Sequence, residues 1–174
     1  KGGAYRKWYG NYEYVVNWEN DGAELRNFRD ELTGKIKSRP QSTHFYFNTG
    51  LTFGAVTSSD FSCRYMEKSI FGGGGNAIFV NEPIYLMGFL NSDVFRQFMD
   101  SLNPTINMLV GDILKVPLIN DSARKLDIVS NVNELINIQK ETWHISELSW
   151  GFERLAFILD GEDKVSNSMS KYIE

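Results

Sequence analysis

The sequence has 174 residues, of which 42% are apolar and 23% are charged, and its net charge is −4 at pH 7. These values lie close to the averages for soluble globular proteins, so they exclude a disordered chain, a collagen-like repeat and a membrane span, and the length favours a single domain with a real core. The negative charge also argues against a nonspecific nucleic-acid coat, which needs a strongly basic surface.

The first half of the chain, residues 1–83, is predicted to be rich in short strands separated by polar loops. Residues 12–18 alternate apolar and polar side chains, the pattern of a half-buried strand, and Asn20-Asp21-Gly22 ends it. Turn-forming residues bound four more strands, which we expect over residues 44–47, 51–57, 61–66 and 77–80.

The strand over residues 61–66 has a distinct two-sided pattern. Alternation puts Phe61, Cys63 and Tyr65 on one face and leaves Ser62 and Arg64 on the other. We expect this second face to point towards solvent or a ligand.

The second half, residues 84–160, is predicted to be helical and extended. Apolar residues four apart over 84–102 indicate one helix that ends at Asn103-Pro104, and an extended apolar stretch follows over 106–119. A second helix is indicated by Asp121 or Ser122 as cap and by four apolar residues at three- and four-residue spacing, Leu126, Val129, Val132 and Ile136. Residues 161–174 are expected to form a frayed tail.

Metal and catalytic patterns are weak. His44 and His144 lie far apart and Cys63 has no second cysteine beside it, so no zinc-type spacing exists. There is no GxSxG elbow, and Gly72–Gly75 is followed by a strand-like stretch rather than by GKS or GKT. We interpret this run as a hairpin loop, with a loop that orders on a ligand as the alternative.

The single cysteine also precludes a disulfide within the chain, and no signal peptide is visible, so a reducing cytoplasmic location is expected. The chain begins with Lys1 rather than Met, which we interpret as a cut inside a longer polypeptide.

Basic, polar and aromatic residues are interleaved in three segments of the first half, namely residues 6–11, 35–43 and 62–65. DNA phosphates accept hydrogen bonds from Lys, Arg and hydroxyl groups, whereas base edges are read by Arg, Gln and Asn. These segments therefore hold both sets of side chains that a DNA-reading surface uses.

Six ordered motifs, KGGAYRKWYGN, VVNWENDG, SRPQSTHFYF, GFLNS, LNPT and VGDILKVPLI, together with residues 131–154, resemble the C-terminal part of the adenine-specific DNA methyltransferases of BREX phage-defence systems, the PglX family. The order of the later motifs is also similar to the target recognition domains of Type I restriction-modification specificity subunits. The resemblance implies a domain over residues 1–160 that recognises the sequence of double-stranded DNA and is not catalytic by itself.

The resemblance also implies the fold and the partners. We expect an α+β fold, with a small twisted and mostly antiparallel sheet, a loop-rich first half and C-terminal helices that buttress it. No cofactor is expected in this segment, while S-adenosylmethionine is expected in a separate methyltransferase domain of a bacterial parent chain. The expected partners are double-stranded DNA, that methyltransferase domain and other phage-defence proteins, with no membrane.

The three basic segments and the motifs carried onto this sequence together suggest ten DNA-binding residues. Arg6, Lys7, Lys37 and Arg64 are expected to pair with phosphates, and Asn11, Arg39 and Gln41 to reach base edges. Trp8 or Tyr9 would stack on the DNA or brace the contact surface, and packing in the protein core is an equally good interpretation of both residues. Thr43 lies in the SRPQSTHFYF motif.

Two other function classes remain open from the sequence. One is a protein-interaction module of the same defence complex, because large aromatic residues also favour protein interfaces. The other is a hydrolytic or carbohydrate-directed enzyme, which would need carboxylates converging in a pocket.

Overall fold

The computed structural model describes residues 2–56, 60–72 and 74–154. The fold is α+β, as predicted, with a small open antiparallel sheet and helices. In chain order the elements are α1 (Glu19–Asn27), the 3₁₀ helix η1 (Thr43–Phe45), β1 (Gly50–Gly54), β2 (Cys63–Met66), β3 (Gly75–Ile78), α2 (Pro83–Leu90), α3 (Asp93–Leu102), α4 (Val110–Ile113) and α5 (Lys125–His144). The predicted tail over residues 161–174 lies outside the described residues.

The sheet has the strand order β2-β1-β3, with antiparallel pairing on both sides of β1. In the register, Thr52 of β1 lies opposite both Arg64 of β2 and Ala77 of β3. Gly72–Gly75 therefore does not join neighbouring strands as a hairpin loop. The Gly75 amide donates to the Gly72 carbonyl over 2.8 Å, and the chain then enters β3 at the opposite edge of the sheet from β2.

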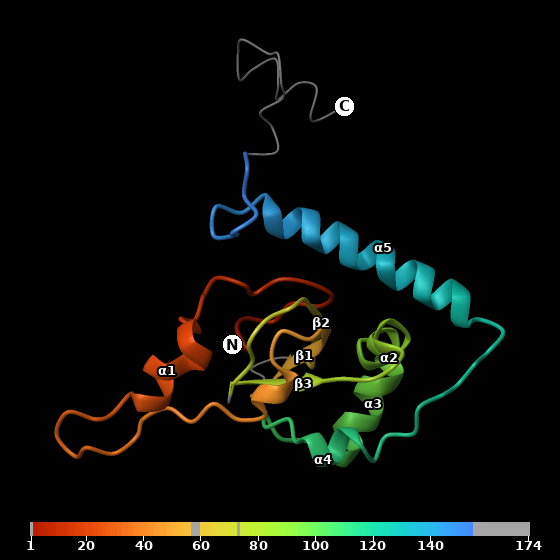
Figure 1. Cartoon of the computed structure of the whole chain (residues 1–174). Coiled ribbons are helices and arrows are strands. Elements are labelled where there is room, and N and C mark those ends of the chain that lie inside the picture. Colours follow the sequence, from red (N-terminus) through yellow and green to blue (C-terminus); the bar gives the residue numbers. More distant parts are fainter. Residues whose placement is uncertain (1, 57–59, 73, 155–174) are drawn as a thin grey trace, which may run out of the picture.

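α2 lies against the sheet, with α3 and α5 packed around it, as Figure 1 shows. α2 contacts β1 and β2, α3 packs against α2, and α5 runs along the outside of α2. The core lies between these layers and is built from apolar side chains of every layer, among them Leu51, Phe53, Cys63, Met87, Leu90, Phe95, Val132 and Ile136.

The predicted helix over 84–102 is two helices, because Asn91 and Ser92 interrupt it. The Ser92 hydroxyl oxygen accepts from the Phe95 amide over 3.2 Å, so Ser92 caps α3, and it also donates to the Phe89 carbonyl. Asn91 is buried, and its side chain exchanges two 2.9 Å hydrogen bonds with the backbone of Cys63. Asn91, at the break between α2 and α3, thus connects the end of α2 to β2.

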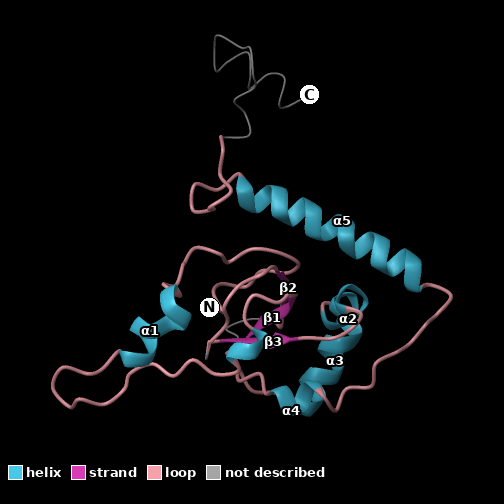
Figure 2. Ribbon diagram, viewed as in Figure 1, coloured by secondary structure: helices cyan, strands magenta, loops and turns pink. Residues whose placement is uncertain are grey.

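Two predicted strands are wrong. Residues 12–18 are extended but pair with no strand, and residues 44–47 begin in η1, so the first half is richer in loops than in strands (Figure 2). The predicted turn at Asn20-Asp21-Gly22 is confirmed, since all three residues have positive φ. Among the described helices, none combines the length and the apolar character that crossing a membrane requires.

Candidate nucleic-acid interface

The first predicted segment, residues 6–11, lies against the body of the protein. The Trp8 amide donates to the Cys63 carbonyl over 3.0 Å, and the Tyr65 amide donates to the Trp8 carbonyl over 2.7 Å. The Lys7 ammonium donates to the Asn91 carbonyl over 2.8 Å. These bonds add the segment to the free edge of β2, so Lys7 and Trp8 hold the fold together.

The other members of this segment are also engaged internally. Tyr9 is buried, and its hydroxyl donates to Glu67, which also pairs with Lys140 of α5. Burial, with the Glu67 charge second, raises the pKa of Tyr9. The Asn11 amide donates to the carbonyls of Gly2 and Ala4, and Arg6 lies over the ring of Trp143, 5.1 Å from its centroid.

Arg64 does not point towards solvent, contrary to the prediction. Alternation along β2 is correct, because Cys63 packs into the helical side and Arg64 projects from the other face. That other face is covered by the N-terminal residues, however, and Arg64 is 2% exposed. Its guanidinium donates to the carbonyls of Gly2 and Arg6, so it lies beneath the N-terminal residues and not on the outer surface.

The second predicted segment forms part of an exposed projection, which we call the basic arm and define as residues 26–41. Its inner part is a hairpin in which Arg29 pairs with Ile36, and the Lys37 amide donates to the Phe28 carbonyl over 2.9 Å. Leu32, at the tip, is 97% exposed. In Figure 1 the arm extends from α1 away from the sheet and the other helices.

Asp30 organises the tip of this hairpin. One of its carboxylate oxygens accepts from the amides of Leu32 and Thr33 and from the Thr33 hydroxyl, and the other pairs with Lys37 over 2.9 Å. The Lys37 hydrogen bond, followed by those from Thr33, lowers the pKa of Asp30 to about 2. Gly34, with φ of 65°, closes the turn in the left-handed region that glycine tolerates.

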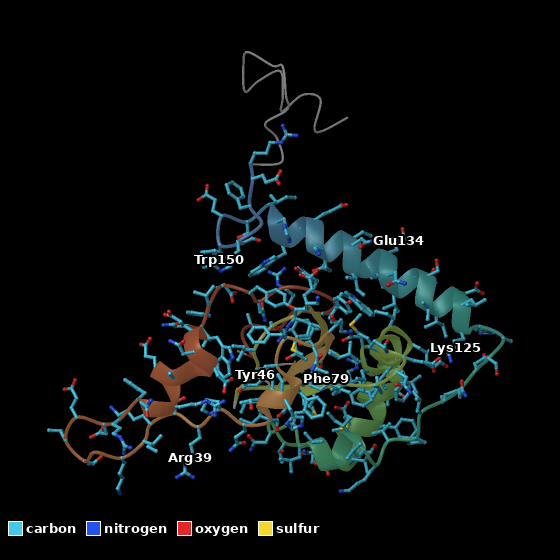
Figure 3. The ribbon with its side chains drawn as sticks, in the orientation of Figure 1. Arg39, Tyr46, Phe79, Lys125, Glu134 and Trp150 are labelled. Carbon is cyan, nitrogen blue, oxygen red and sulfur yellow. The ribbon has the colours of Figure 1, made fainter. Side chains whose placement is uncertain are left out.

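The basic arm concentrates positive charge. It contains five cationic residues, Arg26, Arg29, Lys35, Lys37 and Arg39, against two acidic ones, in a chain whose net charge is −4. Arg26 pairs with Asp21 of α1, and Arg29 donates to the Gly34 carbonyl. Figure 3 shows Arg39 pointing away from the ribbon.

The outer side of the arm is hollowed where it meets α1. The lining residues of this depression are Arg26, Ile36, Ser38, Arg39, Pro40 and Gln41. Thr43 lies just beyond it, half-buried at the start of η1, where its carbonyl accepts from the Tyr46 amide. The fold therefore brings Lys37, Arg39 and Gln41 together and places Arg6, Lys7, Trp8, Tyr9, Asn11 and Arg64 in the body.

Arg26 and Arg29 are members of the arm that sequence reasoning missed. The signal was present, because Arg29 and Lys35 flank the turn residues Asp30 to Gly34, and a hairpin there places both flanks side by side. The segment was not recognised because its apolar residues do not alternate.

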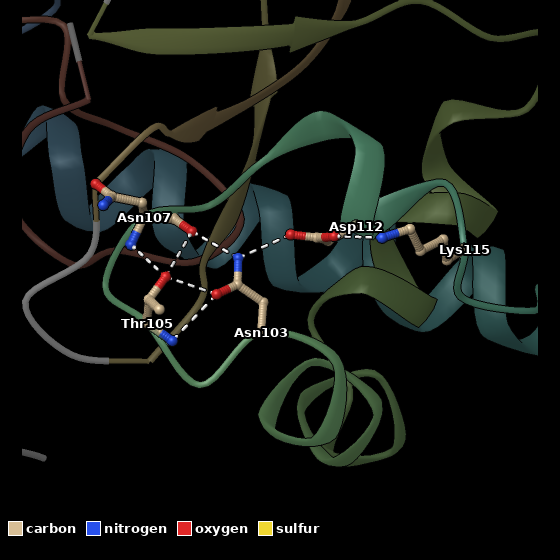
Figure 4. A network of polar contacts seen from close by, with 5 residues as sticks. All are labelled: Asn103, Thr105, Asn107, Asp112 and Lys115. Atoms are coloured by element: carbon tan, nitrogen blue, oxygen red, sulfur yellow. Dashed lines mark hydrogen bonds and ion pairs between the residues drawn. The ribbon is translucent and has the colours of Figure 1, made fainter.

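A second hollow lies beside α4 and has a volume of about 740 Å³. Figure 4 shows the polar network at its wall, where Asn103 donates to Asp112 over 2.9 Å and to the Asn107 carbonyl over 2.8 Å. Lys115, followed by Asn103, lowers the pKa of Asp112. A general acid needs a raised carboxyl pKa, so this network fixes the loop over 103–107 and does not resemble a hydrolytic site.

Other polar clusters give no catalytic arrangement either. Asp60 and Asp93, which line a small cavity, both pair with Arg96. Within residues 2–56, 60–72 and 74–154, no three His, Cys, Asp or Glu side chains gather as a metal site would require.

Comparison with known proteins gives two matches and no family model. The chain is 35% identical over 156 residues to the adenine-specific methyltransferase PglX of Lacticaseibacillus casei (strain Zhang), a match that covers 87% of this chain and 13% of the relative. It is 34% identical over 178 residues to the adenine-specific methyltransferase BrxX of Escherichia coli O9:H4 (strain HS), which covers 99% of this chain and 14% of the relative. The chain thus spans about one seventh of the length of these relatives.

Proposed function

This chain is homologous to one segment of the PglX family of adenine-specific methyltransferases, and from that premise we propose that it is the target recognition region of such an enzyme. In this proposal the region reads the sequence of double-stranded DNA for a phage-defence methyltransferase. S-adenosylmethionine binding and methyl transfer belong to the remainder of the polypeptide.

The observation that carries the proposal is the basic arm. It is exposed, it projects from the fold, and it gathers five cations in a chain that is acidic overall. Positive charge on one projecting element is what phosphate binding requires, whereas acidic residues outnumber basic ones in the rest of the chain.

The shape of the arm suits a groove of the double helix. A two-stranded ribbon fits the major groove of B-DNA, and the hairpin over 28–37 has that form. We assign Arg29, Lys35 and Lys37 to phosphates, and Arg39 and Gln41 to base edges, because a guanidinium and an amide make bidentate contacts with guanine and adenine.

The body residues of the original prediction act differently in this proposal. Lys7, Trp8, Tyr9 and Asn11 form a framework, since each is bonded or packed internally. Arg6 stacks on Trp143 and belongs to the same framework.

The isolated chain should bind duplex DNA weakly, with a Kd in the nonspecific range of roughly 10⁻⁴ to 10⁻⁶ M. Fluorescence anisotropy would measure this. Lys35→Ala should weaken binding to every duplex alike, whereas Arg124→Ala, which removes an exposed cation just before α5, should leave it unchanged. Figure 3 shows the neighbouring Lys125 on the opposite side of the view from Arg39. Equal affinity for the wild type and a variant lacking all five arm cations would reject the arm as the DNA surface.

Specificity must be tested in the full-length enzyme. Exchange of residues 26–41 for those of a relative that methylates a different site should change the methylated sequence, as read by methylome sequencing. If the methylated sequence changes only when residues outside 26–41 are exchanged, bases are read elsewhere.

The second candidate function, a protein-interaction module, is favoured by the region around α4. Large apolar side chains are exposed there, including Ile106, Leu109, Val110 and Leu114, the last of them 79% exposed. Exposed apolar side chains gathered in one segment suit a protein contact, and we assign this contact to the remainder of the methyltransferase chain. Hydrogen exchange should show slower exchange of amides 106–114 in the full-length enzyme than in the isolated chain. Equal exchange rates would reject this contact.

A further inference from the structure

The face of the sheet opposite α2 carries a further hollow that the proposed function does not use. Thr52 and Arg64 lie opposite each other in the register and share this face. The N-terminal segment crosses over it, and a cavity of about 270 Å³ remains between them. Its lining residues include Asn11, Tyr12, Thr52, Arg64, Ser69 and Phe71.

Arg64 is the unusual member of this lining. It is 2% exposed and is the largest of the fully buried side chains among the described residues. Its Nη2 donates to the Gly2 carbonyl over 2.8 Å and its Nη1 to the Arg6 carbonyl over 3.4 Å. Within the described part of the chain, its Nε is the one buried side-chain nitrogen or oxygen that has no hydrogen-bond partner.

The charge of Arg64 is also only weakly compensated. No carboxylate of the described residues forms an ion pair with it, so that the Glu13 charge acts on it only from a longer distance, and backbone carbonyls supply only partial negative charge. Burial is the largest cause of the lowering of its pKa. A buried cation without a counter-charge is costly, so proteins pair such groups with an anion.

We propose that this cavity binds the phosphate group of a nucleotide, with Arg64 as the counter-charge. A guanidinium matches the geometry of phosphate oxygens, Arg64 lines the cavity, and its Nε has no hydrogen-bond partner within the described part of the chain. Ser69 adds a hydroxyl, the other kind of donor that phosphates commonly use.

The remaining walls suit the base of that nucleotide. Tyr12, Phe47 and Phe71 line the same cavity, and aromatic rings bind bases of any sequence by stacking. Val15 and Val16 also line it and are exposed, so the cavity reaches the surface between residues 14–16 and 69–71. The phosphate would come either from a free nucleotide or from the DNA backbone, and this site is independent of DNA binding by the basic arm.

The direct test follows the Nε–H resonance of Arg64 by NMR in the wild-type chain, so that it does not depend on a variant that folds. Titration with inorganic phosphate at constant ionic strength should shift this resonance in a saturable manner at millimolar concentration, whereas chloride should not. A resonance unmoved by inorganic phosphate, dAMP and a short DNA duplex would overturn the proposal.

The same titration distinguishes the two sources. A shift with dAMP but not with the duplex supports a free nucleotide, and the reverse supports the DNA backbone. Arg39→Ala should leave the dAMP titration unchanged, because Arg39 lies on the basic arm. If the arm fails to bind DNA while dAMP still shifts Arg64, the proposed function fails and the nucleotide site stands.

Two variants test the roles of the walls. Phe71→Leu should weaken dAMP binding about tenfold, the usual loss when one stacking ring is removed, and leave inorganic phosphate binding unchanged. Arg64→Lys keeps the charge but loses the Nε donor, and should weaken both ligands. If Phe71→Leu lowers the affinity for both ligands equally, the base does not occupy the aromatic wall, and that part of the proposal is wrong.

Discussion

At the scale of single residues, Asp30 shows how one carboxylate shapes the basic arm. It accepts hydrogen bonds from Leu32 and Thr33 at the tip and pairs with Lys37 on the returning strand. The ionised form makes all of these contacts, which is why its pKa lies below the ordinary value of 3.8, at about 2. The shape of the hairpin is therefore linked to pH.

The sign of this linkage follows from the lowered pKa. The contribution of Asp30 to stability is fully present above its ordinary pKa of 3.8 and is lost as the pH falls through about 2. NMR titration should place the carboxyl midpoint of Asp30 near 2, and the amide signals of Leu32 and Thr33 should move with it. A midpoint at the ordinary value would contradict the hydrogen bonds at the tip.

Asn91 is the residue that links the helices to the sheet. Its side chain bonds both backbone groups of Cys63, and its own carbonyl accepts from Lys7. Replacing it with alanine leaves the buried Cys63 amide without a partner, because Trp8 bonds only the Cys63 carbonyl.

We expect Asn91→Ala to lower the free energy of unfolding by about 2 kcal/mol, the usual cost of one orphaned buried group. Urea unfolding would measure this. The matched control is Asn131→Ala on the exposed side of α5, which should change stability by less than about 0.5 kcal/mol. Equal effects of the two substitutions would mean that Asn91 does not carry this link.

At the scale of elements, the contact between α2 and α5 depends on Gly88. A Cβ atom added there would lie 3.0 Å from Val132 Cγ2 and 3.2 Å from Ile128 Cγ2. The absence of a side chain therefore sets how closely the two helices approach. α5 also contacts Glu67 through Lys140 and Arg6 through Trp143. The contact between α2 and α5 therefore also supports the N-terminal segment, to which Arg6 belongs.

Gly88→Val should lower the free energy of unfolding by about 2 kcal/mol, because the added methyl groups force α5 outward. Gly111→Val in α4 is the matched control, since a Cβ atom there meets nothing within 4 Å. Thermal unfolding by circular dichroism would compare them. A Gly88→Val variant as stable as the Gly111→Val variant would show that α5 tolerates displacement.

At the scale of the whole molecule, charge is segregated between the arm and the body. The arm contains five cationic and two acidic residues, while the whole chain is at −4. If DNA binds through the arm alone, as proposed, the number of phosphates neutralised has an upper limit of five.

This limit predicts the salt dependence of duplex binding. Two of the five cations already pair with Asp21 and Asp30, so the slope of log K against log salt concentration should lie between about −3 and −4.5. Anisotropy titrations at several salt concentrations would give this slope. A slope near zero would count against phosphate contacts, and a steeper one would require cations outside the arm.

The local sequence pattern was sufficient to predict the elements that pack through one apolar face. The three strands of the sheet were predicted within a few residues, and apolar spacing indicated helical structure over 84–102 and 126–136. The single helix predicted over 84–102 is two helices, and the stretch over 106–119 that was predicted to be extended contains α4. The strand predicted over 12–18 is wrong because alternation shows which side chains share a face but not whether a partner strand exists. Those residues instead cross the sheet, where the Tyr12 hydroxyl donates to the Tyr65 carbonyl.

The sequence alone determined the α+β class, the family resemblance, and the residue types of the basic arm, because composition, motif order and charge are properties of the chain itself. Only the tertiary structure decided which cations are accessible. Arg39 and Arg64 look alike in sequence, yet one lies on an exposed projection and the other beneath the N-terminal segment. That difference arises from contacts between residues far apart in the chain, such as Gly2 with Arg64. The local sequence pattern cannot predict such contacts, because it describes only residues that are neighbours in the chain.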